Sequence, residues 1–73
     1  MKTTHEPIDI VVNGEPKQIA AGASLEDLVR SLDLDPRMVV VEHNRAIVRR
    51  GSLASVSLTQ GDSVELVHFV GGG

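Results

Sequence analysis

The sequence ends in three glycines, Gly71, Gly72 and Gly73, directly after the largely apolar run from Val67 to Val70. Glycine has no side chain to bury and loses more backbone entropy on ordering than any other residue, so a folded core gains little from such a tail. The tail is thin enough to enter a narrow channel, and it ends in a carboxylate. We therefore expect the carboxyl group of Gly73 to be the reactive group of this chain, presented to another protein's active site.

The residues before the tail read as the last strand, over residues 63–70, which follows a Gln60-Gly61-Asp62 turn signal. Strand periodicity places Val64 and Leu66 on one face and Val67 and Phe69 on the other. Two interpretations of Phe69 remain open. It is either a core residue or an exposed aromatic anchor for a partner beside the tail.

Composition limits the function classes. The chain has 73 residues, which fits one domain, and it has no cysteine for disulfides or thiolate chemistry. Its net charge of −3 and single aromatic residue argue against nucleic-acid binding. The start of the chain lacks the apolar core of a signal peptide, and the longest apolar runs are far too short for a membrane span. We expect a cytoplasmic protein, monomeric when free.

Other kinds of chemistry find little support. The three histidines, His5, His43 and His68, lack the spacing of a metal site, although the last two could be neighbours across strands. The serines have no paired base, so a hydrolase triad is not supported. Three arginines lie near one predicted hairpin and are either solvated or a contact for an acidic partner surface; they are Arg45, Arg49 and Arg50.

The first half of the chain predicts a hairpin and a helix. Residues 8–12 and 17–20 read as strands around Asn13-Gly14, a strong turn signal. Pro16 fits the start or the edge of the second strand. Ser24 reads as a helix N-cap, with an imperfect capping box because Asp27 stands where Glu or Gln is usual. The apolar stripe of this helix consists of Leu25, Leu28, Val29 and Leu32, and Pro36 blocks its continuation.

The second half predicts strands over residues 38–43 and 46–48, joined by an Asn44-Arg45 turn. Residues 49–60 read as a loop with one short helical turn around Leu53-Ala54. One helix cannot cover both faces of a sheet, so we expect an α+β fold in which a mixed sheet of four or five strands carries one main helix across one face. The domain then spans residues 8–70, between a flexible leader (1–7) and the glycine tail (71–73).

Four segments together resemble a known family. They are the hairpin Val12–Glu15, the helix start Ser24–Val29, the central hairpin Val39–Arg50 and the ending Gly61–Gly73. The chain resembles the sulfur carriers of the ubiquitin-like β-grasp fold, most closely the ThiS family. Asn44-Arg45-Ala46 departs from the Asn-Gly turn common in that family. The resemblance covers about residues 8–73, and the ending is its most specific part.

The resemblance implies a function. Gly73 would be adenylated by a ThiF-type enzyme using ATP and Mg²⁺, and would then receive sulfur that a cysteine desulfurase supplies, forming a thiocarboxylate. A ThiG-type thiazole synthase would take that sulfur for thiamine biosynthesis. The chain would be a protein co-substrate without a bound cofactor of its own. Gly71 and Gly72 would thread the enzymes' channels, and Val67, Phe69 and Val70 would form part of the partner interface.

Other readings of the same features stay open. The small subunit of molybdopterin synthase shares the fold and the Gly-Gly end. A ubiquitin-like modifier would begin with the same activation of the tail and end on a lysine. A passive binding module would make no use of the tail.

Overall fold

The computed structural model describes residues 6–69. The expectations for most of the leader and for Val70 and the glycine tail therefore lie outside the described residues. The elements, in chain order, are β1 (Pro7–Val12), β2 (Glu15–Ala20), α1 (Leu25–Ser31), η1 (Pro36–Met38), β3 (Val39–His43), β4 (Ala46–Val48), η2 (Arg50–Ser55) and β5 (Ser63–His68). No helix within residues 6–69 is long and apolar enough to cross a lipid bilayer.

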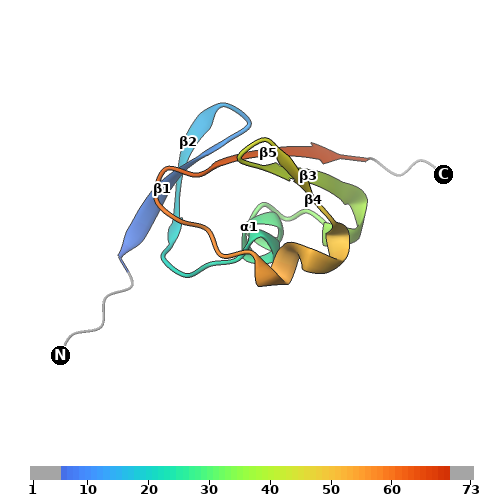
Figure 1. The fold of residues 1–73 in the computed structure, drawn as a ribbon, viewed down its shortest axis with the longest axis horizontal. Helices are drawn as coiled ribbons and strands as arrows, with labels where there is room; N and C mark the ends of the chain where they lie inside the picture. Colours follow the sequence, from blue (N-terminus) through green and yellow to red (C-terminus); the bar gives the residue numbers. More distant parts are fainter. Residues whose placement is uncertain (1–5, 70–73) are drawn as a thin grey trace.

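The strands form one sheet in the order β2-β1-β5-β3-β4, with α1 lying across one face (Figure 1). β5 runs parallel to β1 and antiparallel to β3, while both hairpins are antiparallel. The expected α+β layout, a mixed sheet with one main helix, is confirmed. Pro16 lies in β2, at the edge of the sheet, where the missing N–H costs no interstrand bond.

The helix is fixed at both ends by local hydrogen bonds. Ser24 Oγ accepts from the backbone N–H of Asp27 at 3.0 Å, and the Asp27 carboxylate accepts from the backbone N–H of Ser24 at 2.9 Å. Both arms of the capping box therefore form, and the expectation of an imperfect box was wrong because aspartate reaches back as glutamate would. The helix ends where Asp33, at φ 62°, turns the chain, and the N–H of Leu34 bonds the carbonyl of Val29.

The core lies between α1 and the inner face of the sheet. The predicted helical stripe is buried, with Leu32 partly buried against it. Val64 and Leu66 face this core from β5. The segment 49–60 contributes more than the expected single turn, because η2 buries Leu53 and the following chain buries Leu58. The buried apolar residues are Ile10, Leu25, Leu28, Val29, Val39, Val41, Leu53, Leu58, Val64 and Leu66.

Both two-residue turns have the same backbone geometry but different residues. Asn13 and Gly14 have φ of 51° and 81°, and Asn44 and Arg45 have φ of 51° and 76°. Positive φ at both positions is the turn that matches the twist of a hairpin. Glycine adopts it freely, whereas a side chain there costs about 1–2 kcal/mol. Arg45 thus occupies a strained backbone position, at which the turn geometry favours glycine.

Replacing Arg45 by glycine should therefore stabilise the protein. We expect Arg45→Gly to raise the free energy of unfolding by up to about 1 kcal/mol, since part of the relieved strain is offset by the greater entropy of the unfolded chain. The matched variant Gly14→Ala should lower it by about 1 kcal/mol, because nothing lies within 4 Å of the added Cβ and only the backbone strain acts. Urea denaturation measures both. Destabilisation by Arg45→Gly would contradict the strain assigned to this turn.

Candidate functional site

The described chain ends at one end of the central strand. β5 is the middle strand of the sheet, and its last register pair joins His68 to Val39. The backbone N–H of Phe69 donates to the carbonyl of Met38 at 2.8 Å, so the pairing of the two segments holds the chain up to Phe69. Val70 and the glycine tail, to which the sequence assigns the reactive carboxyl and the channel-threading role, follow directly but lie outside the described residues.

An apolar patch lies beside this point, on the outer face of the sheet, which is the face opposite α1. Val67 is 57% exposed and Phe69 is 53% exposed. Val40 lies opposite Val67 in the register of β3 and β5, and Ile47, on β4, is 71% exposed. Phe69 is therefore exposed and not a core residue, while its role as an anchor for a partner stays a prediction. We call Val40, Ile47, Val67 and Phe69 the outer patch.

Two carboxylates adjoin the outer patch. Glu42 and Glu65 lie directly opposite each other in the register of β3 and β5, and Ile47 lies opposite Glu42 on the other side. Neither carboxylate forms an ion pair within residues 6–69. Like charges at directly opposed positions destabilise a sheet, so this pair works against the fold rather than for it.

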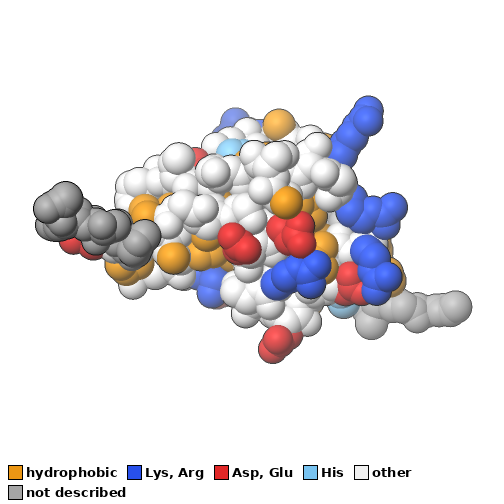
Figure 2. Space-filling model, turned by 90° about the horizontal axis from the view of Figure 1, so that it is seen from below, with side chains coloured by type: hydrophobic (Ala, Val, Ile, Leu, Met, Phe, Trp, Pro, Cys, Tyr) orange, Lys and Arg blue, Asp and Glu red, His pale blue; other side chains and the backbone are white. Residues whose placement is uncertain are grey.

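Arginines border the outer patch on the side where β5 ends. Arg49 and Arg50 line a shallow hollow of about 350 Å³ together with Phe69 and Arg37. Arg45 lies apart from them, at the turn on the opposite end of β4, so the arginine group differs from the expected one. Arg37 was not foreseen, although it immediately precedes a strand that was expected to pair in the sheet. Figure 2, seen from the side of α1, shows basic side chains gathered at the end of the molecule toward which β5 runs.

A second polar cluster lies at the opposite end of β3. His43 Nε2 is 2.7 Å from Asp62 Oδ2, and the Asn44 side chain donates to Asp62 Oδ1 at 3.2 Å. Thr59 adds its backbone N–H at 2.9 Å and its hydroxyl at 3.0 Å. Burial alone would raise the pKa of Asp62, but the hydrogen bonds from His43, Thr59 and Asn44 outweigh it and hold the pKa well below its usual range.

This cluster fastens loops to the sheet. Ser63 donates its N–H to Asn44 Oδ1 at 2.8 Å, and Val11 donates its N–H to the carbonyl of Asp62 at 2.9 Å. The two strand histidines are not neighbours, because the register places His43 opposite Val64 and His68 opposite Val39. Among the residues that the structure describes, no group of three or more potential metal ligands occurs. Through its hydrogen bonds, Asp62 joins the loop before β5 to the end of β3, which is a structural role.

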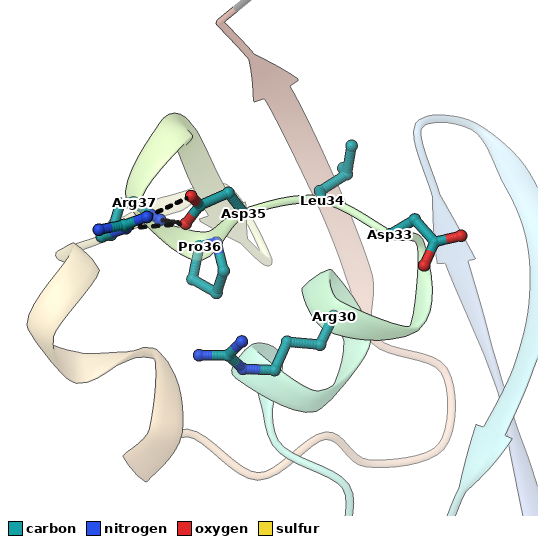
Figure 3. Close-up of a pocket in the computed structure, with 6 residues that line it drawn as sticks. All are labelled: Arg30, Asp33, Leu34, Asp35, Pro36 and Arg37. Atoms are coloured by element: carbon teal, nitrogen blue, oxygen red, sulfur yellow. Dashed lines mark hydrogen bonds and ion pairs between the residues drawn. The ribbon is translucent and has the colours of Figure 1, made fainter.

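Another hollow, of about 510 Å³, lies between the end of α1 and η1 (Figure 3). Its two cations are already matched by carboxylates of this chain. Arg37 makes a two-pronged contact with Asp35, at 3.1 Å and 2.9 Å, and Arg30 pairs with Glu26 at 3.0 Å. The hydrogen bonds from Arg37 lower the pKa of Asp35 to about 2. Asp33 also lines this hollow and forms no ion pair within residues 6–69, so the hollow offers a ligand one exposed carboxylate but no unmatched cation. It is the weaker candidate.

Comparison with known proteins agrees with the fold. A solved structure of the thiamine biosynthesis protein ThiS from Geobacter metallireducens superimposes with a TM-score of 0.76 at 29% identity, over 90% of this chain and all of that one. The five-stranded mixed sheet with one main helix is thus the ubiquitin-like β-grasp fold. A model of the ThiS family matches residues 10–73. The chain belongs to the ThiS family.

Similar proteins include a sulfur carrier and thiazole synthases. The sulfur carrier protein ThiS of Bacillus subtilis is 40% identical over 50 residues, covering 68% of this chain and 76% of that protein. A thiazole synthase of Magnetococcus marinus is 47% identical over 64 residues, covering 88% of this chain. This chain spans only 20% of the length of that synthase, and likewise 20% of a thiazole synthase of Paramagnetospirillum magneticum.

We expect the hydrogen-bonded carboxylate of Asp62 to make the protein less stable in acid. Because the pKa of native Asp62 lies below that of an unfolded aspartate, about 3.9, the unfolded chain takes up a proton first as the pH falls, and the free energy of unfolding decreases through and below that value. Asp62→Asn should flatten this decrease. Asp35→Asn should flatten it less, since the Asp35–Arg37 pair is exposed and screened by solvent.

Urea midpoints measured from about pH 6 down to about pH 2, a range that spans the ordinary aspartate pKa, give the slopes. The slopes are compared rather than the absolute stabilities, because Asp62→Asn also loses hydrogen bonds. Equal slopes for the parent chain and Asp62→Asn would show that this carboxylate does not govern acid stability.

Proposed function

We propose that this chain is a sulfur carrier of thiamine biosynthesis whose reactive group is the carboxyl of Gly73. The match of residues 10–73 to the ThiS family, which includes the glycine tail, carries the proposal. The exposed apolar residues where β5 ends support it, because a carrier must present both its tail and a surface to the enzymes that modify it. The proposal places the chain in the cytoplasm.

Activation must come first. A terminal carboxyl has a pKa of about 3.3–3.7, so it is ionised at neutral pH and reacts poorly with nucleophiles. A ThiF-type enzyme with ATP and Mg²⁺ would join the Gly73 carboxylate to AMP and release pyrophosphate. AMP is then the leaving group: the terminal sulfur of a persulfide, which a desulfurase draws from cysteine, displaces it and forms an acyl disulfide. A second thiol, such as that of free cysteine, attacks the S–S bond and is itself oxidised to a disulfide, which releases the acyl sulfur. The product is the thiocarboxylate. The chain contributes no catalytic group, only an acyl end that docking brings to a high effective concentration.

The acceptor of the sulfur would be a ThiG-type thiazole synthase. Segments 47% and 42% identical to this chain occur within two proteins that are themselves named thiazole synthase. A carrier-like segment in the same polypeptide as the synthase favours a working partnership between the two. We assign Val67, Phe69 and Val70 to the interface with the enzymes, and Gly71 and Gly72 to their channels.

Intact mass spectrometry tests the proposal. The chain is incubated with the ThiF-type enzyme, ATP, Mg²⁺, a desulfurase and cysteine. We expect the mass to rise by the difference between one sulfur and one oxygen, and the modified chain to support thiazole formation by the synthase. A variant lacking Gly72 and Gly73 should show neither change, because the activating enzyme can no longer reach its acyl end.

Bacillus subtilis ThiS, treated in parallel, is the control. If it gains sulfur and this chain does not, the proposed function is wrong. A thiocarboxylate that serves molybdopterin synthase but not thiazole synthase would assign the chain to the other sulfur-transfer pathway. Isopeptide-linked adducts on lysines in cells would assign it to protein modification.

A further inference from the structure

The border of the outer patch carries positive charges that form no ion pair among the described residues. Arg49 and Arg50 form no ion pair within residues 6–69. Arg50 donates one hydrogen bond, at 3.1 Å, to the backbone carbonyl of Arg37. The Arg37 guanidinium is itself matched by Asp35. Two unmatched positive charges, those of Arg49 and Arg50, therefore border the hollow beside Phe69.

This positive end contrasts with the rest of the chain. The net charge is −3, so the remainder of the molecule is more negative still. Such a separation of charge gives the molecule an electric dipole. The field of a charged partner orients this dipole before the two proteins touch. A negatively charged partner would repel most of this surface and attract the end toward which β5 runs.

The neighbours of the two arginines indicate what kind of partner fits. Val40, Ile47 and Phe69 share the same hollow, so a partner must cover apolar side chains as well as meet cations. Free polyanions have no apolar surface to place there. Protein interfaces commonly combine an apolar centre with a charged rim. Charge at the rim speeds association more than it tightens the final complex.

We propose that Arg49 and Arg50 steer the chain onto a carboxylate-rimmed apolar surface of its adenylating enzyme. This inference rests on the proposed carrier function and adds the chemistry of the partner surface. Steering of this kind orients the outer patch, and with it the end of β5, toward the enzyme before the apolar surfaces meet. The carboxylates of the partner supply the counterions that Arg49 and Arg50 lack within residues 6–69.

Association kinetics with the purified ThiF-type enzyme of the same genome test the inference. Stopped-flow rates are measured between about 0.01 and 0.15 M ionic strength, over which the Debye length falls from about 30 to about 8 Å. We expect the association rate of the parent chain to fall as salt rises. Arg49→Gln/Arg50→Gln should lower the rate at low salt by about three- to tenfold and flatten its salt dependence, with little change in dissociation.

Two further variants serve as controls for the association kinetics. Lys17→Gln removes one positive charge from β2, at the far edge of the sheet, and is the matched control for Arg49→Gln; it should retain the salt dependence of the parent chain. Arg49→Gln alone keeps the bond from Arg50 to the Arg37 carbonyl and should show part of the effect, so a local structural change does not explain it. Thermal denaturation confirms that each variant is folded.

The outcomes separate this inference from the function on which it rests. If the parent chain acquires sulfur and binds the enzyme, but the double variant shows the same rates and salt dependence, the steering role is wrong and the carrier function stands. An equal effect of Lys17→Gln also overturns it, because the position of the charge would not matter. If the parent chain neither binds nor acquires sulfur, the carrier function fails and this inference fails with it.

Discussion

The pairing of β5 with both β1 and β3 is the constraint on which the rest of the structure depends. It places the last strand in the middle of the sheet and holds the chain up to the Phe69 N–H, which bonds Met38. The side chain of Asn13 adds a bond to the N–H of Leu66 at 2.8 Å. Because side chains alternate across a strand, burying Val64 and Leu66 forces Glu65 and Val67 outward. The segment leading to the glycines is therefore anchored on one face and exposed on the other.

One helix divides the sheet into two surfaces with different roles. The inner face and α1 share the apolar core, which supplies the stability of a small domain. The outer face keeps features that stability alone does not favour, namely the exposed outer patch and the opposed pair Glu42 and Glu65. Arginines that form no ion pair among the described residues border the patch. These features are concentrated around β5 and its neighbours, so a partner that docks there lies beside the start of the tail. The geometry suits a carrier that is modified by other proteins.

The sequence predicted those parts of the fold that depend on local or periodic signals. Residue spacing was sufficient for the helical stripe, the alternation of side chains along β5 and the Asn13-Gly14 turn, but it left open whether Phe69 is buried or exposed. It was not sufficient for contacts between segments distant in the chain, such as His43 with Asp62, or for the approach of Arg37 to Arg49 and Arg50. Nor did it predict positive φ at Arg45, which the pairing of β3 with β4 imposes. The burial of Leu58 has no periodic signal, because that residue lies outside any helix or strand.

The most direct test of the account is a map of the surface that the activating enzyme covers. Backbone amide signals of the isotope-labelled chain are recorded by NMR with and without the unlabelled enzyme. We predict that the largest perturbations fall on Val40, Ile47, Val67 and Phe69, while the exposed residues of α1, such as Glu26, change little. Perturbations centred on α1, with the outer patch unaffected, would contradict the claim that this face of the sheet presents the chain end to its partners.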